Sequence, residues 1–131
     1  MIDIFGRKIN YVRLSLTDRC NLNCVYCMPK GKSPVFLKKD EIMSVDEIYK
    51  ICLYLSKIGI DTIKLTGGEP LLREDFEDVV KKIKTIDAIK NITLTTNGTR
   101  LEEYLDFLYK QDIKNINISL DSLSPQKYKD I

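Results

Sequence analysis

The 131-residue sequence contains no histidine. This absence excludes Ser-His-Asp and Cys-His catalysis, and it removes the commonest general base near neutral pH and the usual nitrogen ligand of zinc. The N-terminus lacks the apolar core of a signal peptide, and no apolar run approaches the length of a membrane span. We therefore expect a cytoplasmic protein without a membrane partner, in which closely spaced cysteines bind metal or act in catalysis rather than form disulfides.

The sequence also lacks an excess of charge of either sign. Lysine and arginine number 21 against 19 acidic residues, and the basic residues are dispersed among the acids. The extended basic stripe that binds a phosphate backbone is missing, so we expect no nucleic-acid partner. With 44% hydrophobic and 31% charged residues, the composition predicts one soluble globular domain.

Four short segments alternate apolar and polar residues, and stretches with helical periodicity separate them. The segments are Tyr11 to Thr17, Thr62 to Thr66, Ile92 to Thr96 and Asn115 to Asp121. Strands that alternate with helices predict βαβ units, a parallel sheet and thus an α/β fold.

Three amphipathic helices are expected between these strands. The first begins at Ser44, whose side chain can form a capping box with Glu47, and it ends at Gly59. The expected inner positions are Ile48, Ile51, Cys52, Leu55 and Ile58 in the first helix, Phe76, Val79, Val80, Ile83 and Ile86 in the second, and Leu101, Leu105 and Leu108 in the third. A fourth helix begins at Ser124-Pro125, and only six residues follow. Because four strands cannot close a barrel, we expect residues 1–131 to be the truncated N-terminal part of a longer protein.

Each expected strand has one apolar and one polar face. The apolar positions are Val12, Leu14, Leu16, Ile63, Leu65, Ile92, Leu94, Ile116, Ile118 and Leu120. The polar positions include Arg13, Lys64, Thr95, Asn97, Asn117 and Ser119. Because parallel sheets are rarely left bare, we expect the polar face to line a ligand-holding concavity, as in a partial β/α barrel. The alternative is a polar face that is open to solvent.

Three cysteines follow the first strand in the spacing C-x3-C-x2-C, at Cys20, Cys24 and Cys27. Three thiolates on one loop can hold three irons of a 4Fe–4S cluster, and the fourth iron then stays open to a substrate or cofactor. Zinc is the rival, but a structural zinc site needs four ligands. The remaining thiol, Cys52, lies in the apolar stripe of a helix and is expected to be a small buried hydrophobe.

The second strand ends in Thr66-Gly67-Gly68-Glu69-Pro70. Paired glycines let a backbone approach a ligand closely, and Glu69 can offer a carboxylate. Alone, the motif is no more than a turn between a strand and a helix. Parallel strands bind ligands beyond their carboxyl ends, so we expect this turn and the cysteine loop to lie at the same edge.

Together these motifs resemble the radical S-adenosylmethionine (SAM) enzymes, in which C-x3-C-x2-C precedes a Gly-Gly-Glu at the end of the second strand. The sequence is still more similar to the GTP 3′,8-cyclase family of molybdenum-cofactor biosynthesis, and this similarity covers essentially the whole chain. It is carried by Phe5-Gly6-Arg7, Tyr11 to Asn21, Tyr26-Cys27-Met28-Pro29, Leu65 to Leu71, Thr95-Thr96-Asn97-Gly98 and Asn117 to Asp121. The resemblance implies the N-terminal part of a radical SAM core domain, a partial (β/α) barrel with a cluster loop at 18–30 and a turn at 67–70.

The resemblance also implies roles for individual residues. Cys20, Cys24 and Cys27 would hold a 4Fe–4S cluster whose open iron binds SAM, Tyr26, Gly68 and Ser119 would contact SAM, and Arg13, Lys64 and Thr95 would contact GTP. The position of Lys64 is usually arginine in this family, so the charge is kept but the bidentate fork is lost.

The implied reaction converts GTP to (8S)-3′,8-cyclo-7,8-dihydroguanosine 5′-triphosphate, the first step of molybdopterin synthesis. The implied partners are GTP, a reductant for the cluster and the next enzyme of molybdopterin synthesis. The family also carries a second cluster, which is bound by C-terminal cysteines and holds the guanine. Residues 1–131 contain no cysteines for it, so we expect this part alone to give no cyclised nucleotide. Two alternatives remain, namely a radical SAM enzyme acting on a peptide or other small molecule, and a non-catalytic iron–sulfur or zinc-binding module.

Overall fold

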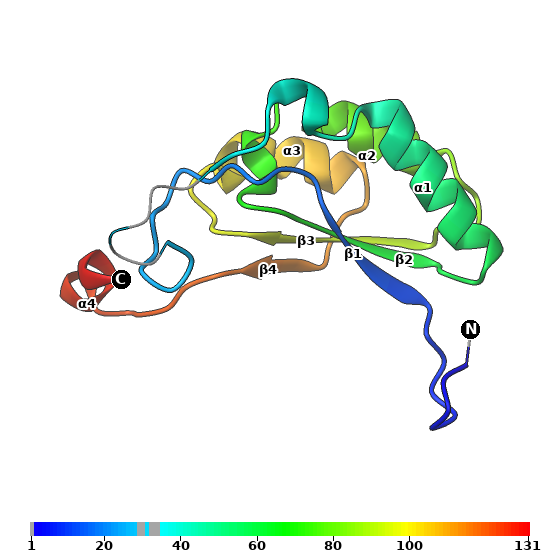
Figure 1. The fold of residues 1–131 in the computed structure, drawn as a ribbon, viewed down its shortest axis with the longest axis horizontal. Helices are drawn as coiled ribbons and strands as arrows, with labels where there is room; N and C mark the ends of the chain where they lie inside the picture. Colours follow the sequence, from blue (N-terminus) through cyan, green and yellow to red (C-terminus); the bar gives the residue numbers. More distant parts are fainter. Residues whose placement is uncertain (1, 29–30, 32–34) are drawn as a thin grey trace.

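Four parallel strands form a single sheet in the order β1-β2-β3-β4 (Figure 1). The computed structural model describes residues 2–28, 31 and 35–131. The strands are β1 (Tyr11–Ser15), β2 (Thr62–Thr66), β3 (Asn91–Thr96) and β4 (Ile116–Ile118). The predicted α/β fold with a parallel sheet is therefore confirmed.

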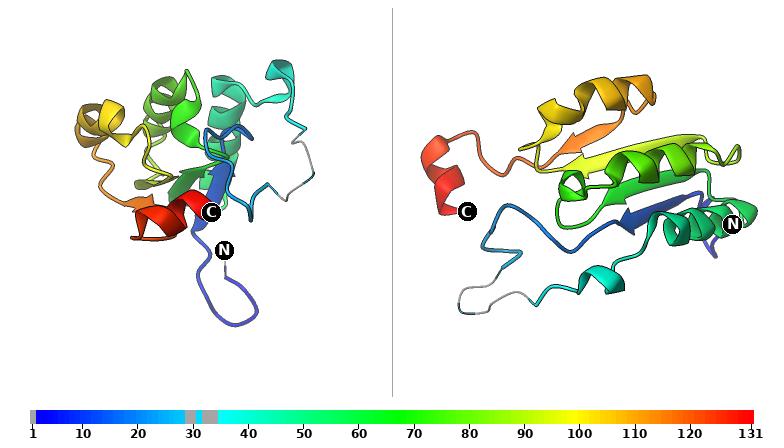
Figure 2. Two further views of the ribbon diagram at one scale, coloured as in Figure 1. Left: turned by 90° about the vertical axis from the view of Figure 1, so that its left-hand side faces the viewer. Right: turned by 90° about the horizontal axis from the view of Figure 1, so that it is seen from above.

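Three helices cover one face of the sheet, and the opposite face carries none in the described chain (Figures 1 and 2). The helices are α1 (Val45–Lys57), α2 (Phe76–Lys84) and α3 (Leu101–Lys110), with α4 (Pro125–Asp130) beyond the carboxyl ends of the strands. Two 3-10 turns, η1 (Lys39–Glu41) and η2 (Pro70–Leu72), precede α1 and α2. No helix within the described ranges is long and apolar enough to cross a membrane.

Helix α1 begins and ends where the sequence predicts. The Ser44 hydroxyl accepts a hydrogen bond from the backbone N–H of Glu47 at 3.3 Å, and the Glu47 carboxylate accepts one from the N–H of Ser44 at 2.8 Å. This reciprocal pair satisfies two backbone donors that the helix itself leaves unpaired. Gly59 follows the helix with a φ of +93°, the left-handed conformation that glycine adopts most readily.

The buried face of α1 is rotated toward α2 relative to the predicted face. Ile51 and Ile58 are exposed, so their predicted inner positions are wrong, whereas Val45 and Tyr49 pack against the core. Because β1 is an edge strand, α1 has a helical neighbour on one side only, and its packing surface turns to that side. The ammonium group of Lys82 in α2 lies 5.3 Å from the centre of the Tyr49 ring.

The buried face of α3, on the other side of α2, is likewise rotated toward α2 relative to the predicted face. Leu105 is exposed, contrary to prediction, while Leu108 is buried and Tyr104 and Phe107 pack on the core. The rings of Tyr104 and Phe107 meet the ring of Phe76 edge-on, with centroid distances of 5.4 and 6.3 Å. Such edge-to-face pairs add to the free energy of burial.

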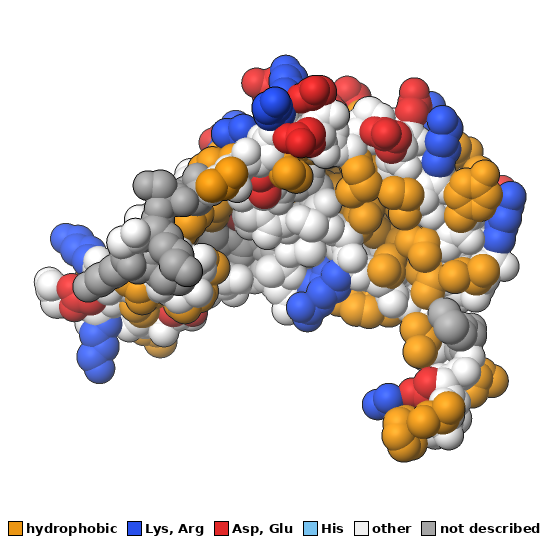
Figure 3. All heavy atoms as spheres, viewed as in Figure 1, with side chains coloured by type: hydrophobic (Ala, Val, Ile, Leu, Met, Phe, Trp, Pro, Cys, Tyr) orange, Lys and Arg blue, Asp and Glu red, His pale blue; other side chains and the backbone are white. Residues whose placement is uncertain are grey.

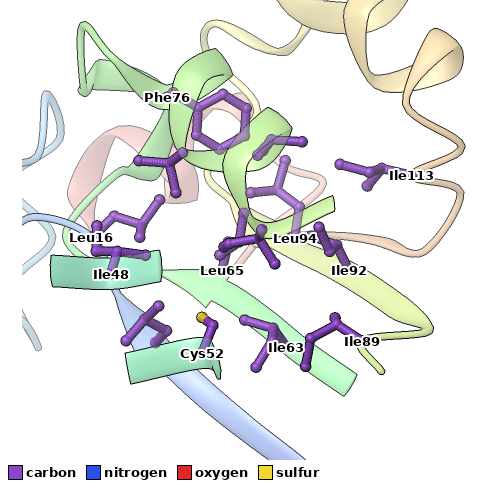
Figure 4. Close-up of a cluster of buried hydrophobic side chains, with 14 of the residues drawn as sticks. Leu16, Ile48, Cys52, Ile63, Leu65, Phe76, Ile89, Ile92, Leu94 and Ile113 are labelled. Carbon is purple, nitrogen blue, oxygen red and sulfur yellow. The ribbon is translucent and has the colours of Figure 1, made fainter. Parts of the chain in front are cut away.

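The centre of the core lies between α2 and the middle strands (Figure 4). All five predicted inner positions of the second helix are buried, because α2 lies between α1 and α3 and packs against neighbours on both sides. The predicted apolar positions of β2 and β3 are also buried, namely Ile63, Leu65, Ile92 and Leu94. On the surface, basic and acidic side chains are interspersed over the helices (Figure 3).

The outer strands are shorter than predicted. Strand β1 ends at Ser15, although the N–H of Leu16 still donates to the carbonyl of Thr66 at 2.8 Å. Strand β4 spans only three residues, and Ile118 and Leu120 are each 57% exposed, so their predicted inner positions are wrong. Helix α4 buries none of its residues, and within the described chain no helix packs over this end of β4.

Candidate cluster and cofactor site

The cysteine loop and the Gly-Gly-Glu turn meet at the carboxyl edge of the sheet, as predicted. The N–H of Gly68 donates to the carbonyl of Thr17 at 2.7 Å, and the N–H of Glu69 donates to the carbonyl of Arg19 at 2.7 Å. These two bonds attach the turn to the residues immediately before Cys20. The position of the first cysteine is therefore set by the turn after β2.

Two glycines are required for this close approach. A Cβ atom on Gly67 would lie 2.6 Å from the carbonyl oxygen of Thr17, and one on Gly68 would lie 2.2 Å from that of Arg19. Both distances are too short for any other residue unless the backbone moves. The glycines thus allow the turn to pack against the start of the cysteine loop.

The Glu69 side chain is not offered to a ligand, so that interpretation of the motif is wrong. It is 1% exposed, and one carboxylate oxygen accepts hydrogen bonds from the N–H of Leu71 at 3.0 Å and the hydroxyl of Thr96 at 2.8 Å. The other oxygen accepts from the N–H of Asn97 at 2.7 Å. A buried carboxylate is stable only with such donors, and here it joins the ends of β2 and β3.

The three cysteines of the loop lie within electrostatic range of one another. Cys20 and Cys24 are half-buried and Cys27 is exposed. The N–H of Cys27 donates to the carbonyl of Cys24 at 2.9 Å, which closes a turn between them. Desolvation raises the pKa of the Cys27 thiol above its ordinary value, and the charges of Cys24 and Cys20 raise the pKa further.

Three cysteine thiolates on one loop are a donor set that fits an iron–sulfur cluster. Among the described residues, no three His, Cys, Asp or Glu side chains are close enough together to hold one ion. A cubane cluster instead takes each thiolate on a different iron, so its ligands stand farther apart. Residues 29 and 30, at the end of the predicted cluster loop, lie outside the described residues.

Three residues predicted to contact SAM come from three segments at this edge. Gly68 is exposed beside the cysteine loop, and the N–H of Ser119 donates to the carbonyl of Thr96 at 2.9 Å. The hydroxyl of Tyr26 donates to the Asp121 carboxylate at 2.7 Å, and this bond raises the pKa of Tyr26 above its ordinary value. Their contacts with SAM stay predictions.

The residues predicted to contact GTP lie on the sheet face without helices. Arg13 and Lys64 are partners in the β1–β2 register, and Thr95 pairs with Asn117 of β4. The Lys64 ammonium donates to the Asn117 side-chain oxygen at 2.9 Å, and the Arg13 guanidinium donates to the Tyr11 hydroxyl at 3.0 Å. Two cations side by side suit an anionic ligand, although the contacts with GTP stay predictions.

A family model for the radical SAM superfamily matches residues 14–131. The chain belongs to the radical SAM superfamily. Proteins of this superfamily use a 4Fe–4S cluster and SAM, in agreement with the donor set at the carboxyl edge of the sheet.

Several curated proteins named GTP 3′,8-cyclase are similar to this radical SAM chain. Those of Peptoclostridium acidaminophilum, Aquifex aeolicus (strain VF5) and Clostridium botulinum (strain Okra / Type B1) are 45%, 44% and 46% identical to it, over 98%, 97% and 100% of the chain. The chain spans 39%, 40% and 41% of the lengths of these relatives.

Two solved structures of BtrN share the fold. One, in an open conformation, has a TM-score of 0.66 at 20% identity and covers 93% of this chain and 55% of that protein. The other, in complex with AdoMet and 2-DOIA, has a TM-score of 0.64 at 19% identity, over 95% of this chain and 51% of that protein. At this identity the likeness supports the fold alone.

A cavity of about 710 Å³ lies on the side of the sheet that the helices cover, not on the polar face. Its lining includes Thr17, Arg19, Met43, Ser44, Leu72 and Arg73, and none of the predicted GTP residues. The ligand-holding concavity on the polar face therefore stays a prediction.

Sequence reasoning gave no role to Asn97 or Arg73. The Asn97 amide contacts the Cys20 sulfur, and the buried Arg73 guanidinium donates to the carbonyls of Leu16 and Met43 at 2.8 and 2.7 Å. Asn97 was visible only as one polar position in a motif that resembles a family. Nothing in the local pattern distinguishes Arg73 from a surface arginine.

Proposed function

We propose that the chain forms the N-terminal part of a GTP 3′,8-cyclase, the radical SAM lyase that begins molybdenum-cofactor biosynthesis. The observation that carries the proposal is an identity of 44–46% to proteins of that name over nearly the whole chain. The proposed substrate is GTP. A reductant for the cluster, the next enzyme of molybdopterin synthesis as partner and a cytoplasmic location belong to the same proposal.

Cys20, Cys24 and Cys27 would hold the cluster, and its open iron would bind SAM. When bound, the cluster would supply one electron for the reductive cleavage of SAM, and SAM would supply the radical chemistry at the substrate. The protein's own residues bind and orient the reactants and exclude water. Tyr26, Gly68 and Ser119 lie at the carboxyl edge of the sheet, where they would position SAM beside the cysteines.

The polar face of the sheet would hold GTP. Arg13 and Lys64 supply adjacent positive charges for a triphosphate, and the Thr95 hydroxyl is a neutral donor from the next strand. Lysine acts as a point charge where arginine would form a fork, so Lys64 contributes attraction more than orientation. Its bond to Asn117 orients the ammonium group across the face.

A chimera tests the proposal directly. In the chimera, this chain replaces the matching N-terminal part of the Clostridium botulinum relative. The chimeric protein is incubated anaerobically with dithionite, SAM and GTP carrying deuterium at C3′. Forming a bond at C3′ requires that hydrogen to leave, so we expect deuterium in the 5′-deoxyadenosine. ATP labelled at the same carbon is the matched control, and it should transfer none.

Variants of the chimera separate the two halves of the proposed site. Arg13→Ala should reduce deuterium transfer from GTP at least tenfold, a typical loss for a charged contact, and leave reductive SAM cleavage nearly unchanged. Lys64→Arg should retain transfer because it restores the family's usual residue. A chimera that holds its cluster and cleaves SAM but transfers no deuterium from GTP contradicts the assignment of GTP as substrate.

A further inference from the structure

We propose that Asn97 is a positioning residue for the cluster, acting through a hydrogen bond to the sulfur of Cys20. The Asn97 side-chain nitrogen lies 3.7 Å from the Cys20 sulfur, within the range of N–H···S bonds. The same sulfur accepts a bond from the backbone N–H of Leu22 at 3.4 Å. The proposal rests on Cys20 as a cluster ligand and is independent of the identity of the substrate.

The orientation of the Asn97 amide follows from its other partners. Its oxygen accepts hydrogen bonds from the backbone N–H of Thr99 at 3.0 Å and from the Thr99 hydroxyl at 2.7 Å. A backbone N–H can only donate, so the amide oxygen must face Thr99. The NH₂ group then faces the Cys20 sulfur, and it also donates to the side-chain oxygen of Asn21 at 2.9 Å.

The backbone of Asn97 is anchored at the same time. Its N–H donates to the buried carboxylate of Glu69 at 2.7 Å, and that carboxylate is held by Thr96 and Leu71. The Gly-Gly-Glu turn therefore holds Asn97 through the Glu69 side chain. The backbone of the same turn holds the segment before Cys20, through its hydrogen bonds to Thr17 and Arg19. The distance between the amide and the sulfur is set from both sides.

An N–H donor at a ligand sulfur changes the redox properties of an iron–sulfur cluster. The reduced cluster carries one more negative charge than the oxidised one, and part of that charge resides on the thiolates. A hydrogen bond stabilises the reduced form more, so it raises the reduction potential. Asn97 thereby favours uptake of the electron and fixes the rotamer of Cys20.

The test is a redox titration of the chain, reconstituted anaerobically with iron and sulfide and titrated with dithionite under EPR detection. Asn97→Ala removes the donor, and we expect a more negative midpoint potential. The reduction equilibrium should change by about tenfold, which is about 59 mV for one electron. Asn97→Asp keeps the acceptor for Thr99 but has no N–H, so its shift should be at least as large.

Thr99→Val is the matched control. It removes the hydroxyl from the same network, but the Thr99 backbone N–H still orients the Asn97 amide. We expect a smaller shift than in either Asn97 variant. Where a variant binds less iron, the potential of the cluster that it retains is the quantity compared.

An unchanged potential in both Asn97 variants overturns the proposal, and so does a Thr99→Val shift as large as theirs. A wild-type chain that binds no iron overturns the assignment of Cys20, and the proposal with it. Iron analysis distinguishes these results, and neither depends on whether GTP is the substrate.

Discussion

Cys52 shows how burial removes a thiol from metal chemistry. Its side chain is completely buried on the inner face of α1, and burial raises the pKa of its thiol to about 11. At neutral pH it is therefore a protonated hydrophobe, as its place in the apolar stripe of the helix predicts. The periodicity of apolar residues is enough to predict the burial of Cys52, because its position on the inner face of a helix determines its surroundings.

We predict that Cys52→Ala binds as much iron as the wild type, whereas Ala at Cys20, Cys24 or Cys27 abolishes binding. Removing one buried sulfur should cost about 1 kcal/mol in the free energy of unfolding. Iron analysis and urea denaturation measure the two effects. Loss of iron from Cys52→Ala would indicate a site with four cysteines and no open iron.

Glu69 is the residue at which local sequence reasoning failed. A carboxylate in a glycine-rich turn suggests a ligand contact, but its hydrogen-bond donors come from Leu71, from Thr96 at the end of β3 and from Asn97 directly after it. Only the assembled sheet brings them together. The glycines of the motif have a clear physical reason, but that reason is packing against Thr17 and Arg19.

We predict that Glu69→Gln destabilises the fold by about 1–3 kcal/mol. Each carboxylate oxygen accepts a hydrogen bond from a backbone N–H group, one from Leu71 and one from Asn97. In glutamine an NH₂ group replaces one of these oxygens, and it would face an N–H donor that it cannot accept from. Urea denaturation measures the loss, and the surface variant Glu77→Gln is the control. Wild-type stability together with weakened SAM binding would show instead that Glu69 is a ligand residue.

At the scale of elements, the sequence predicts which segments are helices better than which faces they bury. Ser44, Gly59 and the apolar periodicity define where α1 begins and ends, because caps and turns depend on local geometry. The rotation of α1 and α3 toward α2 depends on which helices have neighbours. That arrangement is a property of the sheet order, so Ile51 and Leu105 were misplaced.

Arg73 joins three of these elements, and its ion pair with Asp75 predicts an acid-sensitive contact. Its side chain is 8% exposed, it contacts carbonyls after β1 and before α1, and its Nε lies 2.5 Å from the Asp75 carboxylate. The hydrogen bond from Arg73 lowers the pKa of Asp75 below its ordinary value. The contact therefore stabilises the fold above the ordinary pKa of 3.8 and is lost as the pH falls through the lowered value.

We predict that Asp75→Asn lowers stability at pH 7 and that its difference from the wild type shrinks as the pH falls below about 4. Urea midpoints measured between pH 7 and pH 3 test this. Glu77, whose exposed pair with Lys81 lies on the surface of α2, is the matched site, and Glu77→Gln should change little at any pH. A constant difference between Asp75→Asn and the wild type would contradict the account.

At the scale of the whole molecule, the alternation of strands and helices was enough to predict the parallel sheet and the edge where the motifs meet. The contact between Asn97 and Cys20 was beyond prediction, because it joins residues from two loops of the folded sheet. The cavity on the helical side was also missed, since loops from several elements line it. Local patterns locate the site, whereas its hydrogen bonds depend on the assembled fold.

We propose above all that Cys20, Cys24 and Cys27 hold a 4Fe–4S cluster with one iron open to SAM. The most direct measurement is the EPR spectrum of the anaerobically reconstituted, reduced chain, recorded with and without SAM. We expect the signal of a reduced cluster of about four irons, a change in that signal on adding SAM, and no signal in the Ala variants of the three cysteines. A chain that binds zinc and gives no signal, or a cluster signal that SAM leaves unchanged, would contradict it.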